Sequence, residues 1–139
     1  MNDTRHFIIP GEPQGKGRPR FMRNGHTYTP DKTRSYEQAV QYYYNAQCHH
    51  TPFEQGVGLV ATIECIYGIS KSASVKRKQA MLCGLEKPCK KPDADNAAKI
   101  VLDSLNGIAY HDDSQITTLH VNKRYGVEPC VKVWISKEE

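Results

Sequence analysis

Two pairs of aspartates have the types and spacing of a metal-binding site. Asp93 and Asp95 occur in the run KPDADN, and Asp112 and Asp113 follow in the run HDDSQ. A turn after Gly107 would let the chain fold back toward the start of the helix that is expected from Asp95. Alternate residues of an extended segment project to the same side. Crowded carboxylates repel one another, and a divalent cation relieves that repulsion. Because every ligand would be an oxygen, the site favours Mg²⁺ or Mn²⁺ over zinc.

The acidic pairs occur in a chain that is otherwise basic. Its 139 residues include 19 Lys and Arg against 15 Asp and Glu, for a net charge of +4. Such a chain is typical of a nucleic-acid partner, and a metal ion held against a polyanion predicts a metal-dependent nuclease. Two clusters are candidates for gripping phosphates, although either could be only a solvated basic loop: Lys16, Arg18 and Arg20, then Lys76, Arg77 and Lys78.

Lys99 is the predicted basic member of the site. It lies four residues after Asp95 and four before Asp103, so on a helix it would reach the acidic residues from the exposed face. In a nuclease it would orient the attacking water or contact the scissile phosphate. The alternative is an ordinary ion pair along the helix. Likewise, Asp95 could be only a helix cap and Asp112-Asp113 only a turn.

The elements that must position these residues are predicted from apolar spacing and turn residues. We expect α+β architecture with a mixed sheet and two to three helices, in a single domain of residues 1–139. Residues 11–30 are predicted to be a loop with a small hairpin at Asn24-Gly25, and the last helix is predicted to be capped by Asp95-Asn96. Strands are expected at 6–9, 59–67, 116–125 and 130–135, and helices at 32–48, 74–83 and 95–105.

Other features indicate where such a chain would work. It has no apolar run long enough to cross a membrane and no signal peptide, so we expect a cytoplasmic protein without a membrane partner. The five cysteines form no CxxC motif, which favours reduced thiols. Cys48-His49-His50 invites a zinc site, but a helix C-terminus is the expected reading, and Trp134 is expected in the core.

Taken together, KPDADN, Lys99, LDSLNG and DDSQ resemble the RusA family of Holliday junction resolvases, and GKGRPR, YTP and Tyr36-Glu37 are similar to its phage and prophage branch. The resemblance implies a RusA-like fold and a homodimeric endonuclease. Such an enzyme uses Mg²⁺ or Mn²⁺ to resolve four-way DNA junctions by paired nicks, in recombination, repair or phage DNA processing. The family's three essential aspartates match Asp93, Asp95 and Asp113, its important lysine matches Lys99, and Asp112 aligns with a neighbouring acid.

Two other functions compete with junction cleavage. One is a different metal-dependent phosphohydrolase that acts on nucleotides or RNA. The other is a catalytically silent protein that binds branched DNA. The carboxylates argue against the silent binder, because acids placed near phosphates weaken DNA binding unless a metal lies between them.

Overall fold

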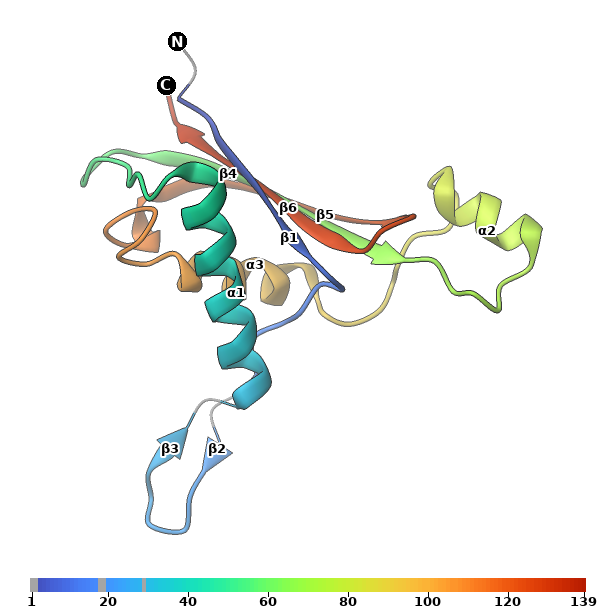
Figure 1. The fold of residues 1–139 in the computed structure, drawn as a ribbon, viewed down its shortest axis with the longest axis horizontal. Helices are drawn as coiled ribbons and strands as arrows, with labels where there is room; N and C mark the ends of the chain where they lie inside the picture. Colours follow the sequence, from blue (N-terminus) through green and yellow to red (C-terminus); the bar gives the residue numbers. More distant parts are fainter. Residues whose placement is uncertain (1–2, 18–19, 29) are drawn as a thin grey trace.

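The computed structural model describes residues 3–17, 20–28 and 30–139. Three helices and a four-stranded sheet form the body of the described chain (Figure 1). In chain order the elements are β1 (Arg5–Pro10), β2 (Arg20–Phe21), β3 (Thr27–Tyr28), α1 (Asp31–Cys48), β4 (Leu59–Gly68), α2 (Val75–Leu82), α3 (Ala94–Ser104), the 3₁₀ turn η1 (Asp113–Gln115), β5 (Ile116–Gly126) and β6 (Cys130–Lys137).

The sheet is mixed, which confirms the predicted α+β class. Its strand order is β1-β6-β4-β5, with β5 parallel to β4 and the other neighbours antiparallel. The parallel pair requires a crossover, and the segment from 69 to 115, which contains α2 and α3, provides it. The predicted hairpin is also present, because β2 and β3 pair antiparallel around Asn24-Gly25 and project away from the body (Figure 1).

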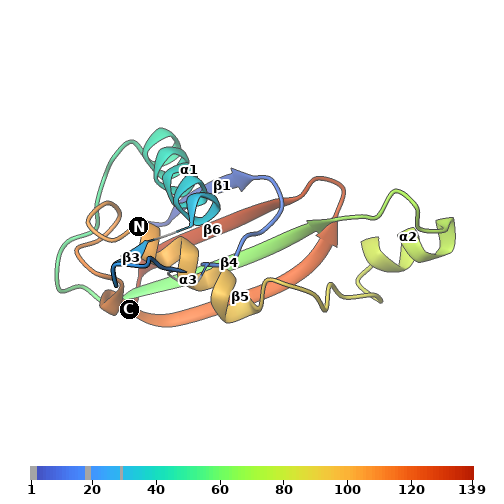
Figure 2. The same cartoon turned by 90° about the horizontal axis from the view of Figure 1, so that it is seen from below.

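One face of the sheet carries α1 and α3 and buries the hydrophobic core (Figure 2). Along β4, the alternate residues Leu59, Ile63 and Tyr67 are buried on this face, as strand periodicity requires. From α3, Ile100 and Leu105 pack into the same core with no exposed surface. The helices therefore form a single layer over the sheet.

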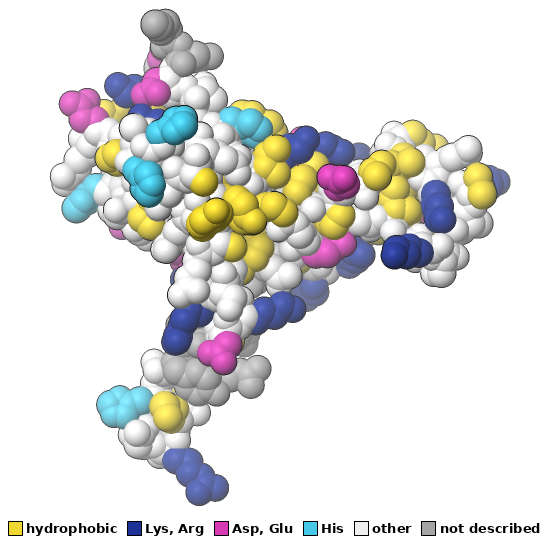
Figure 3. Space-filling view, viewed as in Figure 1, with side chains coloured by type: hydrophobic (Ala, Val, Ile, Leu, Met, Phe, Trp, Pro, Cys, Tyr) yellow, Lys and Arg dark blue, Asp and Glu magenta, His cyan; other side chains and the backbone are white. Residues whose placement is uncertain are grey.

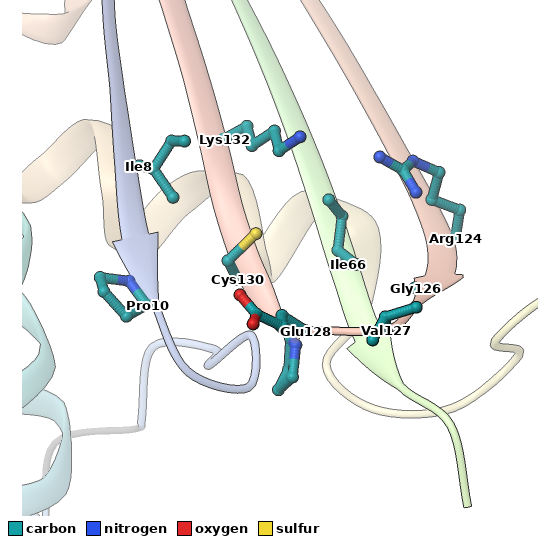
Figure 4. A pocket seen from close by; sticks show the side chains of 10 residues that line it. Ile8, Pro10, Ile66, Arg124, Gly126, Val127, Glu128, Cys130 and Lys132 are labelled. Carbon is teal, nitrogen blue, oxygen red and sulfur yellow. The ribbon is translucent and has the colours of Figure 1, made fainter.

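The opposite face of the sheet is not covered by any helix of the described chain. Figure 4 looks onto it and shows Ile8, Ile66, Arg124 and Lys132 standing on four different strands around a hollow of about 580 Å³. The prediction that Trp134 lies in the core is wrong. Its side chain points to this open face and stacks on His6, with ring centroids 4.5 Å apart, because β6 places Val133 and Ile135 on the helix side.

The start of α3 also differs from the prediction. The N-cap is Asp93, and Asp95 lies in the first turn rather than at the cap. A carboxylate in the first turn is favourable because it faces the positive end of the helix dipole. The helix ends where predicted, at a C-cap on Leu105.

The remaining expectations concern membrane-spanning helices, the cysteines and the end of α1. Among the described helices, none combines the length and the apolar character that a membrane span requires. All five cysteines are free thiols, and the α1 helix ends at His49, as expected for the Cys48-His49-His50 segment.

The packing of α3 leads to the first prediction. Replacing Ile100 by Ala removes a fully buried side chain and should lower the free energy of unfolding by about 2–5 kcal/mol, because a cavity remains against the sheet. Urea denaturation followed by circular dichroism measures this loss. The control Val75→Ala, at a side chain that is 73% exposed, should change stability by less than about 0.5 kcal/mol. Equal effects of the two substitutions would contradict the assigned core.

Candidate active site

Asp103 and Asp113 form the acidic pair that the fold brings together. Asp103 lies in the last turn of α3, and Asp113 begins η1 after the chain has turned back. The return is fixed by two hydrogen bonds. The Tyr110 hydroxyl donates to the Leu102 carbonyl at 2.6 Å, and the Asp113 backbone N–H donates to Asn106 Oδ1 at 2.7 Å. The chain does turn back after α3, but the prediction that it returns toward the start of that helix is wrong. These contacts hold Asp113 beside the C-terminal end of α3, next to Asp103.

The two carboxyl groups of this pair share a hydrogen bond and titrate differently. Burial, the hydrogen bond to Asp103 and the negative charges of Asp103 and Asp112 together raise the pKa of Asp113. For Asp103, burial acts in the same direction but is outweighed by hydrogen bonds from Lys16 and Asp113, so its pKa is lowered. Of the pair, Asp113 is the member that retains a proton more readily.

Two lysines surround Asp103. The Lys16 ammonium lies 2.7 Å from Asp103 Oδ2 and 3.8 Å from Glu37 Oε2, and the Lys99 ammonium lies 3.8 Å from the same Asp103 oxygen. The side chain of Lys99 is 62% exposed, against 30% for Lys16. The alternative reading of Lys99, as a partner in an ion pair along the helix, is thus observed. Its exposure leaves it accessible to a DNA phosphate as well.

Asp93 and Asp95 lie at the other end of α3. The Asp93 carboxylate is exposed and lies 3.2 Å from the Lys91 ammonium, and Asp95 is exposed in the first turn. Eight residues separate Asp95 from Asp103, which corresponds to about 12 Å along a helix axis. The exposed side of α3 therefore carries a stripe of three charged residues: Asp95, Lys99 and Asp103. Asp93 lies beside Asp95 at the start of the helix, and Asp113 lies beside Asp103 at its end.

This separation bears on the predicted metal ligands. Within the described residues, no group of three or more His, Cys, Asp or Glu side chains is arranged to hold a metal ion. The assignment of Asp93, Asp95 and Asp113 to one ion, with Lys99 beside it, remains a prediction. The chemistry of the donor set still suits Mg²⁺ or Mn²⁺, since it is made of carboxylate oxygens.

Asp112 has a local structural role. Its carboxylate accepts a hydrogen bond from the Ser114 backbone at 2.9 Å, and the Gln115 side chain accepts one from the Asp112 backbone, completing a capping box. Hydrogen bonds from the side chain and the backbone of Ser114 lower the pKa of the Asp112 carboxyl. Asp112 is therefore a turn residue, as the alternative interpretation expected. That it also binds a metal ion remains a prediction.

The predicted DNA-binding residues occupy different surroundings. Lys76 is exposed on α2, while Arg77 forms a bidentate pair with Glu86 at 3.1 Å. Lys78 is half-buried on the same helix. Lys16 is engaged with Asp103. Arg18 and the side chain of Arg20 lie outside the described residues.

Sequence reasoning missed three members of this site: Asp103, Glu37 and Asn106. Asp103 entered the sequence argument as a neighbour of Lys99 and as part of the LDSLNG run, but not as a site residue. Its spacing of four residues from Lys99, which is itself four from Asp95, placed all three on one side of the helix. Asn106 follows in the LNG run. Nothing local in the sequence links Glu37, on α1, to this pair.

Comparison with known proteins identifies the family of this chain. The model of the family described as Endodeoxyribonuclease RusA matches residues 10–136, nearly the whole chain. The chain belongs to the RusA endodeoxyribonuclease family. A relative from Bacillus subtilis (strain 168), described as uncharacterized protein YqaN, is 39% identical over 137 residues and covers 96% of each chain. The RusA match includes both ends of α3 and η1, so the carboxylates discussed above all lie inside it.

The raised pKa of Asp113 leads to the second prediction. A carboxyl whose folded pKa lies above its unfolded value of about 3.8 destabilises the fold once it ionises. Asp113→Asn should therefore raise the free energy of unfolding at pH 7, by no more than about 1 kcal/mol because the site is open to solvent. This gain should shrink as the pH falls through the folded pKa and vanish below the unfolded one. Urea denaturation from pH 7 to pH 3 measures it.

The control for this prediction is Asp31→Asn, at an exposed residue in the first turn of α1. It should give no gain at pH 7. A loss of stability in Asp113→Asn at pH 7 would contradict the repulsion inferred for the pair.

Proposed function

We propose that this chain is a Mg²⁺-dependent endonuclease that resolves four-way DNA junctions by paired nicks, acting as a homodimer. The observation that supports this most directly is the Asp103–Asp113 pair on the exposed side of α3, flanked by lysines, in a member of the RusA endodeoxyribonuclease family. Two carboxyl groups whose pKa values are shifted in opposite directions, beside basic groups, are typical of a functional site.

The residues proposed to hold Mg²⁺ or Mn²⁺ are Asp93, Asp95 and Asp113, which match the family's essential aspartates. When bound, the cation polarises a phosphodiester and lowers the pKa of a water molecule. Lys99 lies midway along the stripe, where its exposed ammonium can contact the scissile phosphate and stabilise developing negative charge.

Two parts of the chain that project from the body, the α2 segment and the β2–β3 hairpin, are proposed to bind the DNA backbone. Lys and Arg side chains lie on the α2 segment and on the β2–β3 hairpin, the two parts that extend furthest from the body (Figure 3). Phosphate contacts from such residues give affinity and salt dependence, and they position the DNA without reading its sequence. Because the two projections leave the body in different directions, they fit a branched substrate better than a single straight duplex.

Symmetry supports the proposed homodimer. A four-way junction has two-fold symmetry, and resolving it requires two matching cuts. A dimer of this chain would present two copies of the α3 stripe in related orientations. The described residues of one protomer contain one such stripe, which would make one cut. Two cuts at matching positions would therefore require two protomers.

The third prediction tests the function itself. With Mg²⁺, the protein should nick a synthetic four-way junction at symmetric positions and leave a linear duplex of the same sequence intact, as read on denaturing gels. Asp95→Asn should reduce cleavage at least about 100-fold, the effect typical of losing a catalytic charged group, while junction binding in a gel-shift assay persists.

Asp31→Asn is the matched control and should cut like the parent protein. Equal cutting of junction and duplex would contradict junction selectivity. Turnover of nucleotides with no action on junctions would favour a small-molecule phosphohydrolase, and undiminished cutting by Asp95→Asn would remove Asp95 from the mechanism.

The fourth prediction concerns α2. The double change Lys76→Ala and Lys78→Ala should weaken junction binding and lower the slope of log affinity against log salt by about one per lost phosphate contact. The cleavage rate at saturating protein should stay unchanged, since α2 lies away from the carboxylates. Fluorescence anisotropy at several salt concentrations measures the slope. Lys137→Ala, at an exposed residue at the end of β6, is the control, and an unaltered slope in the α2 variant would exclude α2 from the DNA interface.

A further inference from the structure

Lys16 occupies an unusual place for a residue predicted to grip DNA. Its ammonium lies against Asp103, 87 residues away in the sequence, at 2.7 Å, and also faces Glu37 on α1. Only 30% of the side chain is exposed. The hydrogen bond to Asp103 is the main cause of its raised pKa, so the charge is kept rather than lost on burial. Lys16 is therefore part of the acidic site and points away from solvent.

The backbone around Lys16 is built to hold it there. The Lys16 carbonyl accepts a hydrogen bond from Asn96 Nδ2 at 3.4 Å, and the Gly17 N–H donates to Thr33 Oγ1 at 2.9 Å. Both neighbouring glycines are needed for close approach. A Cβ at Gly15 would lie 2.9 Å from the Pro92 Cβ and closer still to Asn96, and one at Gly17 would lie 2.6 Å from Thr33 Oγ1. The Gly-Lys-Gly run is thus fitted between the starts of α1 and α3.

Asp103 needs a cation at this position. It lies in the last turn of α3, where the negative end of the helix dipole disfavours a carboxylate, and that turn contains no basic residue. It also lies beside Asp113. Lys99 reaches the same oxygen only at 3.8 Å and is largely exposed, whereas Lys16 is closer and more buried. Lys16 is the main compensating charge for the acidic pair.

We propose that Lys16 is a positioning residue of the cleavage site: its ammonium holds Asp103 beside Asp113 and ties the 15–17 segment to α1 and α3. This inference rests on the proposed nuclease function. Lys16 acts through Asp103 and does not contact the DNA. It keeps the carboxylate pair assembled before metal and substrate arrive.

The first experiment measures the coupling between Lys16 and Asp103 without metal or DNA. Unfolding temperatures in EDTA are compared for the parent, Lys16→Met, Asp103→Asn and the double variant. Lys16→Met should lower the unfolding temperature because two carboxylates lose their counter-charge. In the Asp103→Asn background the same change should have a much smaller effect. Lys32→Met, an exposed lysine at the start of α1 without an ion pair among the described residues, should leave the temperature unchanged. Additive effects of Lys16→Met and Asp103→Asn would overturn the proposal.

The second experiment separates positioning from phosphate binding. For Lys16→Met, junction affinity in EDTA should stay within about twofold of the parent and its salt slope should be unchanged, because no phosphate contact is lost. The single-turnover cleavage rate at saturating protein should fall by about 10-fold or more, and Lys16→Arg should restore most of it because the cation remains. A lower affinity with a slope reduced by about one, and an unchanged cleavage rate, would instead assign Lys16 to the DNA grip.

Failure of the proposed function is distinguishable from failure of this inference. A parent protein that cuts no junction would overturn the nuclease proposal. It would also overturn the proposed effect of Lys16 on the cleavage rate. The unfolding cycle does not depend on activity, so it decides on its own whether Lys16 holds Asp103.

Discussion

The carboxylate site depends on the packing of α3 against the sheet. Ile100 and Leu105 anchor the helix in the core, and this fixes which of its sides faces solvent. Residues four apart on a helix stay on one side, so the same packing aligns Asp95, Lys99 and Asp103 outward. The return of the chain to Asp113 is held by groups at the end of this helix, including the carbonyl of Leu102. A shift of α3 on the sheet would therefore displace both ends of the stripe at once.

The repulsion between Asp103 and Asp113 destabilises the folded protein. Two neighbouring carboxyl groups cannot both ionise freely, and the raised pKa of Asp113 together with the lowered pKa of Asp103 expresses that conflict. Solvent access keeps each pairwise effect small. In the proposed nuclease the same repulsion is useful, because a divalent cation that relieves it is bound more tightly. The chain gives up some stability at the place where function requires concentrated charge.

Much of the fold could be predicted from the sequence because it depends on local patterns. The alternation of β4 and the apolar spacing of α3 each specify which side of an element is buried, and the observed elements agree with those predictions within a few residues. The N-terminus of α3 was misplaced because Asp93 and Asp95 are both good capping residues, and the choice between them depends on how the preceding segment approaches.

The contacts that complete the site could not be predicted in this way. Periodicity identifies the exposed side of a helix but not the distant segment that lies against it. The link from Lys16 to Asp103 joins residues 87 apart, and it depends on the packing of α1 against α3. The role of Glu37 depends on the same arrangement. From the sequence alone, Lys16 was indistinguishable from the basic residues that follow it in the GKGRPR run.

This arrangement connects the N-terminal segment physically to the carboxylates. Lys16 lies only four residues before β2, the first strand of the projecting hairpin. The Lys16 carbonyl and the Gly17 N–H are both hydrogen-bonded, which fixes this part of the segment against α3 and α1. In the proposed complex, a hairpin that contacts DNA and a lysine that neutralises Asp103 therefore belong to one short stretch of sequence. The same stretch would serve substrate binding and the charge balance of the acidic pair.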